Sequence, residues 1–250
     1  MKTTKTIRLY VDSKINISDN CILSANKSHY LSNVMRCKEG DYIYCFNERD
    51  GEFLSEIIVI DKKRTVILPK KQTKKYSKEV DLWLLFAPLK KDSTDFVIEK
   101  ATELGVSKII PVITKYTNCD KVKTERFVTQ AIEASEQCER LSVPSINETI
   151  KLKDILEAWD SERSLFFMNE RRASLPIVDA FSKNSSKSVA ILIGPEGGFS
   201  DEEAKFIESF PFVKSVNMGS RILRAETAVV SALSIWQACV GDWNKKEDII

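Results

Sequence analysis

Histidine is almost absent from this sequence, because His29 is the single imidazole in 250 residues. A catalytic triad with histidine as base would depend on that one side chain, and no Gly-x-Ser-x-Gly elbow accompanies it, which disfavours hydrolase chemistry. The cysteines include no Cys-x-x-Cys pair, so the usual spacing of zinc ligands is missing and we expect no metal site. We predict small buried apolar side chains in a reducing compartment for all six cysteines, namely Cys21, Cys37, Cys45, Cys119, Cys138 and Cys239.

Long apolar runs are missing as well. No run approaches the ~20 apolar residues that a membrane-spanning helix requires. The first residues, MKTTKTIRLYVDSK, alternate apolar with polar side chains instead of forming the apolar core of a signal peptide. Eight glycines and seven prolines are too few for a disordered or fibrous chain, and 43% hydrophobic residues are ordinary for globular proteins. We therefore expect a soluble, cytoplasmic protein with a buried core.

The net charge is only +2, but positive charge is concentrated in one stretch. Between Asp61 and Lys91 there are ten Lys and Arg residues and three acidic residues. Such a stripe suits a polyanion, because each neutralised phosphate releases counterions; a solvated, charge-rich linker explains the same residues. The segment PKKQTKKYSKE has no apolar period, so we place a domain boundary there, between residues 1–72 and 73–250.

The residues before this boundary predict a small β-barrel. Four runs rich in β-branched and aromatic residues, IRLYV, DYIYCF, EFLSEIIVI and TVILP, are typical of strands. One helical piece interrupts them: in NKSHYLSNVMR, the side chains of Leu31, Val34 and Met35 recur at helical spacing. This spacing predicts a short amphipathic turn that packs on the barrel.

The residues after the boundary predict an α/β domain. Apolar strands such as VDLWLLFAP, KIIPVIT, LFFM, VAILIG and VKSVNMG alternate with helical patterns. Strands separated by helices imply βαβ crossovers and a parallel sheet covered on both faces. Gly105 follows the helical pattern around Val97 and Ala101 and is predicted to end that helix.

A glycine-rich loop follows one of these strands. The strand VAILIG leads into Gly194-Pro195-Glu196-Gly197-Gly198, and a helix then opens with Ser200 as N-cap and Glu203 three residues later. In an open α/β sheet, ligands bind outside the carboxyl ends of the strands, where this loop would lie. The loop has neither the Gly-x-Gly-x-x-Gly pattern nor a Gly-Lys-Ser/Thr ending, which disfavours dinucleotide and P-loop sites. A tight structural turn is the alternative interpretation.

A polar turn at the start of the last helix is the second candidate site. In VNMGSRILRAETAVVSALSIW, a strand reaches Met218-Gly219, and Arg221, Arg224 and Glu226 follow at the helix start. Unpaired N–H groups of a helix N-terminus together with arginine forks suit a phosphate or carboxylate. A surface ion pair between Arg224 and Glu226 explains the same residues.

Five separated motifs resemble one protein family. IGPEGGFSDEE and the later MGSRILRAETA are similar to the cofactor-binding end of the SPOUT methyltransferases, specifically the RsmE family of 16S rRNA (uracil(1498)-N(3))-methyltransferases. HYLSNVMR resembles the N-terminal helix of that family, EKATELGVSKIIPV its helix-to-strand passage, and EASEQCERLSVPSI a further segment. The chain departs from the family where Tyr116 stands in place of a frequent arginine and Cys138 in place of a frequent serine.

The resemblance implies a fold and an activity. It implies a PUA-like β-barrel followed by a SPOUT-type parallel sheet with a C-terminal trefoil knot, and a homodimer. It also implies S-adenosyl-L-methionine as methyl donor and N3 of one uridine in 16S rRNA of the small ribosomal subunit as acceptor. Two rival functions stay open: a non-catalytic RNA-binding factor of ribosome assembly, and a SPOUT enzyme that acts on tRNA or on a ribose 2′-hydroxyl.

The resemblance also implies site residues. We expect Arg224, with Arg221, to stabilise negative charge on the uracil oxygens and Glu226 to orient the arginine or accept the N3 proton. The residues expected to bind the cofactor are Phe167, Met168, Gly194, Pro195, Glu196, Gly197, Gly198, Met218, Gly219, Ile222 and Leu223. The residues expected to contact RNA are Arg8, His29, Arg36, Lys70, Lys71, Lys74, Lys75, Gln137 and Arg140.

Overall fold

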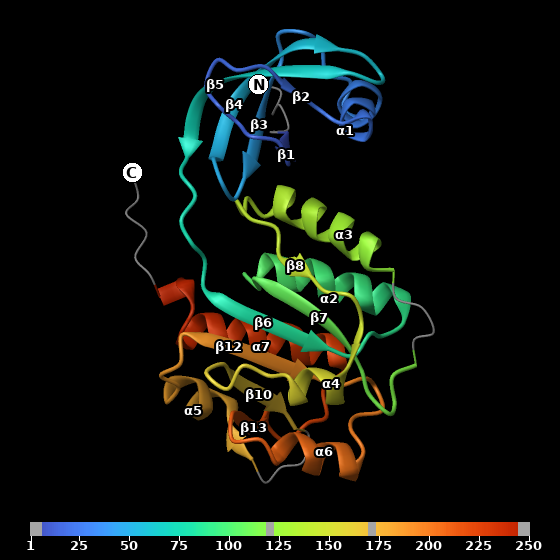
Figure 1. Ribbon diagram of the computed structural model, residues 1–250, viewed down its shortest axis with the longest axis vertical. Helices are drawn as coiled ribbons and strands as arrows, with labels where there is room; N and C mark the ends of the chain where they lie inside the picture. Colours follow the sequence, from blue (N-terminus) through green and yellow to red (C-terminus); the bar gives the residue numbers. More distant parts are fainter. Residues whose placement is uncertain (1–6, 119–122, 170–173, 245–250) are drawn as a thin grey trace. The chain divides into compact units, whose positions relative to one another are not determined.

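The computed structural model describes residues 7–118, 123–169 and 174–244, and the chain forms two compact units (Figure 1). The first unit comprises Met1–Lys78 together with Ser135–Val143, and the second comprises Glu79–Ala134 and Pro144–Ile250. The change of unit after Lys78 falls within the lysine-rich stretch. The return of residues 135–143 to the first unit has no counterpart in the sequence pattern.

The first unit is a five-stranded sheet in the order β1-β3-β4-β5-β2. β1 pairs with β3 in parallel, and the remaining neighbours are antiparallel. Register shifts between β4 and β5 bend the two long strands around the core, as bulges do. All four predicted strands are present, whereas the two-residue β2 is too short to leave a pattern. The strands are β1 (Arg8–Tyr10), β2 (Cys21–Ile22), β3 (Tyr42–Asn47), β4 (Gly51–Ile60) and β5 (Thr65–Lys74).

The predicted helical piece of this unit consists of α1 (Ala25–His29) and a π-helical turn, η1 (Tyr30–Val34). Leu31 is fully buried in the core of the sheet, as predicted. Val34 is 61% exposed, so the prediction that it packs on the barrel is wrong. The backbone N–H of Met35 donates to the carbonyl of Tyr30, five residues back, and this wider turn rotates Val34 off the face that Leu31 occupies.

The second unit contains an entirely parallel eight-stranded sheet in the order β11-β13-β10-β12-β6-β7-β8, with β9 also paired to β7 (Figure 1). The predicted α/β sheet is thereby confirmed. The strands are β6 (Asp81–Phe86), β7 (Lys108–Ile113), β8 (Ser145–Ile146), β9 (Ile150–Lys151), β10 (Ser164–Met168), β11 (Leu175–Pro176), β12 (Ser188–Ile193) and β13 (Val213–Asn217).

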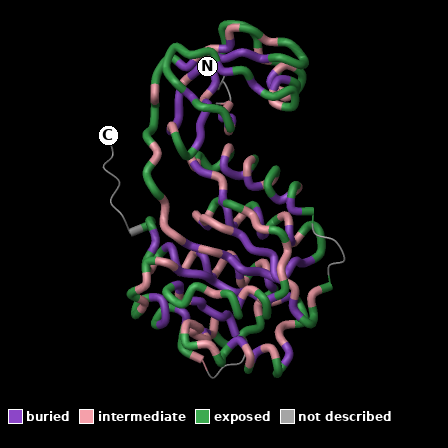
Figure 2. The backbone as a smooth tube through the Cα atoms, viewed as in Figure 1, coloured by how far each residue is buried: buried purple, intermediate pink, exposed green. Residues whose placement is uncertain are grey.

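Helices cover both faces of this sheet. On one face, α4 (Leu152–Glu157) and α6 (Asp201–Glu208) contribute Leu156 and Ile207 to a core shared with Leu192 of β12. Figure 2 shows that the strands carry much of the buried backbone. The sheet is therefore shielded from water over most of its length, as parallel sheets usually are.

On the other side, α7 (Ala225–Cys239) packs against α2 (Lys91–Glu103), α5 (Ile177–Ser182) and β12. The predicted end of α2 is confirmed: Gly105 has a φ of +79°. The backbone N–H groups of Gly105 and of the next residue donate to carbonyls of the last helical turn, which is a Schellman motif. The remaining helices are α3 (Thr124–Gln137) and the 3-10 helix η2 (Asp242–Asn244).

The cysteines only partly follow the prediction. Cys21 and Cys45 are buried, while Cys37 and Cys239 are half-buried. Cys138 is exposed, because it lies in the turn after α3, so the prediction of a buried side chain is wrong there. Cys119 lies outside the described residues.

Candidate functional site

A cavity of about 700 Å³ lies at the carboxyl ends of three neighbouring strands of the second unit, β13, β10 and β12. The segment after each of these strands contributes to its lining, because parallel strands bring their carboxyl ends to one edge of the sheet. Twelve of the predicted site residues line this cavity. They are Met168, Gly194, Pro195, Glu196, Gly198, Met218, Gly219, Arg221, Ile222, Leu223, Arg224 and Glu226.

Two residues predicted to bind cofactor lie outside the lining. Phe167 is fully buried, with its ring edge-on to that of Phe199, a lining residue, at a centroid distance of 5.0 Å. Gly197 faces a neighbouring turn: a Cβ atom added to it would lie 3.0 Å from Cβ of Tyr116. A Cβ on Gly194 would overlap the ring of Phe199. Two glycines of the loop therefore make room for aromatic side chains, a packing role that the motif did not reveal.

The predicted capping box of α6 is confirmed. Ser200 Oγ accepts from the N–H of Glu203 at 3.2 Å, and Glu203 Oε2 accepts from the N–H of Ser200 at 3.0 Å. The second carboxylate oxygen of Glu203 accepts from the N–H of Lys115 at 2.6 Å. Glu203 therefore joins the glycine loop to the turn after β7, which carries Tyr116.

The loop after β13 turns through a left-handed residue. Gly219 has a φ of +97°, and its N–H donates to Oδ1 of Asn217 at 3.2 Å. A Cβ atom on Gly219 would have the nearest described atoms more than 4 Å away, although this residue lines the cavity. The backbone of Gly219 is thus open to a ligand.

Charged side chains surround the start of α7. Arg224 is the N-cap residue, with an extended backbone and an exposed side chain, and Glu226 lies in the first helical turn. Among the ion pairs of the described residues, none joins Arg224 to Glu226, so the alternative interpretation as a surface ion pair finds no support. Arg221 is also exposed and lines the same cavity.

Sequence reasoning missed four polar residues of the lining, Lys90, Ser93, Asn118 and Asn169. Lys90 and Ser93 come from the start of α2, and Asn169 follows β10. Asn169 Nδ2 donates to Oε1 of Glu208 at 2.9 Å, an oxygen that also accepts from Ser215 Oγ at 2.7 Å. No motif marks these residues, since only the packing of separate elements brings them to one edge. The cavity combines both signs of charge, apolar walls and open backbone, and its volume lies in the range of sites for small organic ligands.

Most of the predicted RNA contacts lie on the surface of the first unit. His29 and Arg36 are exposed at the two ends of the segment that contains η1, and Arg36 has a φ of +56°. Gln137 is exposed and Arg140 is half-buried. Arg8 is buried, so its placement does not support direct contact with RNA.

The predicted lysines form an exposed strip. Lys70, Lys71 and Lys74 lie on β5, so this part of the basic stretch is a strand and the interpretation as a linker is wrong for it; Lys75 follows directly. Lys70 Nζ lies 2.8 Å from a carboxylate oxygen of Glu56. Each of these lysine side chains remains accessible to a polyanion.

In residues 7–118, 123–169 and 174–244, no helix is long and apolar enough to cross a bilayer. The same ranges contain no group of three His, Cys, Asp or Glu side chains that could hold a metal ion.

Known proteins resemble this chain over nearly its whole length. A family model described as an RNA methyltransferase domain matches residues 76–237, and one described as an RNA methyltransferase PUA domain matches residues 23–69. The chain is 36% identical over 228 residues to the ribosomal RNA small subunit methyltransferase E of Rickettsia conorii, covering 91% of this chain and 93% of that protein. It is 29% identical to the protein of the same name from Bacillus subtilis, covering 85% and 87%.

Solved structures agree with these relatives. A ribosomal RNA small subunit methyltransferase E from Neisseria gonorrhoeae, bound to S-adenosyl methionine, has a TM-score of 0.83 at 27% identity, covering 96% of this chain and 100% of that chain. A methyltransferase from Legionella pneumophila, described as putative and in complex with bound SAM, also has a TM-score of 0.83, at 28% identity, covering 94% and 98%.

Proposed function

The chain belongs to the ribosomal RNA small subunit methyltransferase E family, and we propose that it transfers a methyl group from S-adenosylmethionine to N3 of one uridine in 16S rRNA. The resemblance of its sequence motifs to this family is therefore confirmed. The observation that supports the activity of this chain itself is the cavity at the ends of β10, β12 and β13, which brings together the glycine loop and the arginine-rich turn.

The residues that line the cavity fit the methyl donor. The open backbone at Gly219, and the part of the 194–198 loop that lines the cavity, can offer amide and carbonyl groups to the edge of an adenine. Met168, Met218 and Leu223 offer apolar contacts for its faces. When bound, S-adenosylmethionine supplies its methyl group already activated as a sulfonium. The protein must then align the attacking nitrogen with the methyl carbon and remove the proton that this nitrogen carries.

The charged residues at the start of α7 are suited to that task. Uridine N3 carries a weakly acidic proton, which must leave before the nitrogen lone pair can form the new N–C bond. Glu226 is a carboxylate of the cavity lining that can accept this proton. Arg224 and Arg221 line the same cavity and can stabilise the negative charge that develops on the uracil oxygens.

The exposed cationic side chains of the first unit are proposed to bind the RNA. N3 lies on the pairing edge of uracil, so the target base must be unpaired or flipped out. His29, Arg36 and the lysine strip of β5 can bind phosphates without reading sequence, which positions the RNA and leaves base selection to the cavity.

A homodimer, the trefoil knot and a cytoplasmic site of action belong to the same proposal. Exposed apolar side chains on α5 and after α7 support a partner surface: Val178 is 52% exposed, Val240 37% and Trp243 59%. The knot is proposed from family membership alone. Ribosomal RNA as the substrate supports a cytoplasmic site of action.

Two matched glycine variants test the cofactor site. Gly219 and Gly40 have φ values of +97° and +88°, and at both a Cβ would lie more than 4 Å from the nearest described atoms. Gly219 lines the cavity, whereas Gly40 is an exposed residue of the first unit. Calorimetric titration should show S-adenosylmethionine binding weakened about tenfold or more in Gly219→Ala and unchanged in Gly40→Ala, because one added carbon matters only inside a pocket. Equal affinities for the two variants would contradict the assignment.

Methylation assays then test the acceptor. Small ribosomal subunits, naked 16S rRNA and tRNA are each incubated with the protein and methyl-labelled S-adenosylmethionine, and the modified nucleotide is mapped by nuclease digestion and mass spectrometry. The proposal requires 3-methyluridine in 16S rRNA. Methylated tRNA, or a 2′-O-methyl group, would favour another substrate, and cofactor binding without methylation would favour the non-catalytic assembly factor.

A further inference from the structure

Arg8 of β1 is a buried cation whose charge is paired inside the first unit. Its side chain is 5% exposed, and Nε lies 2.7 Å from Oε2 of Glu52, which is 3% exposed. The guanidinium also lies over the ring of Phe46, 4.3 Å from the centroid. Thr73 Oγ1 donates to the other carboxylate oxygen of Glu52 at 2.8 Å. The Arg8–Glu52 ion pair is therefore enclosed by side chains of neighbouring strands.

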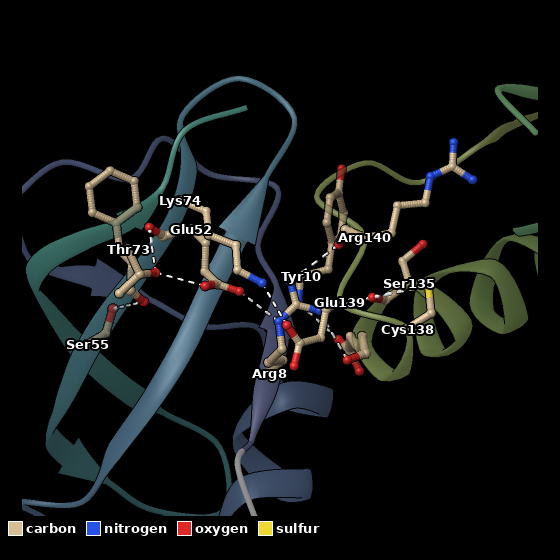
Figure 3. Close-up of polar contacts among 12 residues, drawn as sticks. Arg8, Tyr10, Glu52, Ser55, Thr73, Lys74, Ser135, Cys138, Glu139 and Arg140 are labelled. Atoms are coloured by element: carbon tan, nitrogen blue, oxygen red, sulfur yellow. Dashed lines mark hydrogen bonds and ion pairs between the residues drawn. The ribbon is translucent and has the colours of Figure 1, made fainter. Parts of the chain in front are cut away.

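The remaining nitrogens of Arg8 donate to a segment distant in sequence, residues 135–143 (Figure 3). Nη1 donates to the carbonyls of Ser135 at 3.1 Å and Glu136 at 3.2 Å, and Nη2 donates to the carbonyl of Arg140 at 3.3 Å. The first two carbonyls belong to the last turn of α3, where helical partners run out and a cation is favourable. One planar fork thus fixes both the end of a helix and the turn after it.

Other contacts also hold this segment, two of them to strands of the same unit. The N–H of Tyr10 donates to Oε1 of Glu136 at 2.9 Å. Lys74 Nζ lies 2.6 Å from Oε2 of Glu139, but these side chains are 46% and 63% exposed, and exposed ion pairs contribute little. Arg8 is the buried, multiply bonded contact, and lysine could not replace it because an ammonium lacks the fork.

The segment that Arg8 holds carries two proposed RNA contacts. Gln137 is exposed, and Figure 3 shows the side chain of Arg140 directed away from Arg8 while its carbonyl is bound by Arg8. We infer that Arg8 is a positioning residue for RNA binding: it fixes the 135–143 segment so that Gln137 and Arg140 meet the substrate in a set geometry. This inference rests on the proposed function, and it replaces a direct RNA contact for Arg8.

The test separates positioning from simple stability. Arg8→Met alone would leave Glu52 buried without its partner. The main variant is therefore Arg8→Met combined with Glu52→Leu. Replacing a whole buried ion pair by apolar residues is often neutral for stability. Hydrogen exchange of the amides in residues 135–143 should accelerate about tenfold or more, since three hydrogen bonds from a charged donor are lost. The KM for 16S rRNA should rise by a similar factor, with kcat and S-adenosylmethionine affinity unchanged.

A second arginine–carboxylate pair, in which the arginine side chain is 7% exposed and the carboxylate side chain 38%, provides the control. Arg163 Nη2 lies 2.6 Å from Oδ2 of Asp81, and its guanidinium lies 3.6 Å from the centroid of Trp83. Arg163→Met with Asp81→Leu removes the same chemistry from the second unit and should leave both hydrogen exchange in 135–143 and the KM for RNA unchanged.

The outcomes distinguish the inference from the function on which it rests. If the wild-type protein methylates 16S rRNA and the Arg8 double variant does so with an unchanged KM, the positioning role is overturned while the function stands. Unchanged exchange in 135–143 would overturn it independently of any activity. A wild-type protein that methylates no RNA refutes the function and this role together. Should the double variant fail to fold, Arg8→Lys, which keeps the charge and loses the fork, is measured in its place, with the same rise in KM expected.

Discussion

Gly197 of the glycine loop packs against Tyr116, so the effect of Gly197→Ala on the free energy of unfolding should depend on the residue at position 116. A Cβ on Gly197 would lie 3.0 Å from Cβ of Tyr116 and 3.5 Å from its Cγ, whereas carbon atoms in ordinary contact are ~3.5–4.0 Å apart. Overpacking of this kind costs about 1–3 kcal/mol. The φ of Gly197 is not in the left-handed region, so alanine also gains about 0.4–1 kcal/mol from the less flexible unfolded chain.

The expected net effect of Gly197→Ala is therefore a loss of about 1 kcal/mol in the free energy of unfolding. Tyr116→Ala keeps the Cβ that causes the clash, so the loss should persist in that background. Tyr116→Gly removes the Cβ, and there Gly197→Ala should become stabilising by about 0.4–1 kcal/mol.

The assay is urea unfolding followed by tryptophan fluorescence, because all four tryptophans lie in the second unit. A double-mutant cycle then isolates the coupling between the two positions, provided that the m-value is unchanged. If Gly197→Ala has the same effect with tyrosine, alanine and glycine at position 116, the packing explanation for this glycine is refuted.

Three further outcomes are expected. Burial raises the pKa of Asp81, but hydrogen bonds from Arg163 and Ser188 outweigh it and hold the pKa below its ordinary value of 3.8. The Asp81 side chain is 38% exposed, so solvent screens the pair, and wild type should exceed Asp81→Asn in stability by less than about 1 kcal/mol near neutral pH. Thermal unfolding should show this difference disappear as the pH falls through that depressed pKa. Ser200→Ala removes the α6 cap and should cost about 1 kcal/mol in urea unfolding, whereas an unchanged midpoint would contradict the cap's role. Arg224→Met should lower the single-turnover rate of methyl transfer about a hundredfold with little change in S-adenosylmethionine affinity, and a rate near that of wild type would exclude it from charge stabilisation.

The sequence by itself predicted the features that depend on neighbouring residues. The principal strands of both units follow from β-branched and alternating patterns. The C-terminal end of α2 follows from Gly105, and the start of α6 follows from Ser200 and Glu203. The loop motifs after β12 and β13 identified most of the cavity lining, because the carboxyl ends of parallel strands share one edge.

Only the tertiary structure decided the features that depend on residues far apart in the chain. Phe199 fills the space at Gly194, Tyr116 lies against Gly197, and Arg8 binds the end of a helix more than a hundred residues away. The local sequence of a glycine motif is the same whether the glycine makes room for a ligand or for an aromatic ring. The sequence around an arginine likewise does not show whether its side chain lies on the surface or in the core. Burial and partner geometry decide between such roles, and they arise only when distant segments pack together.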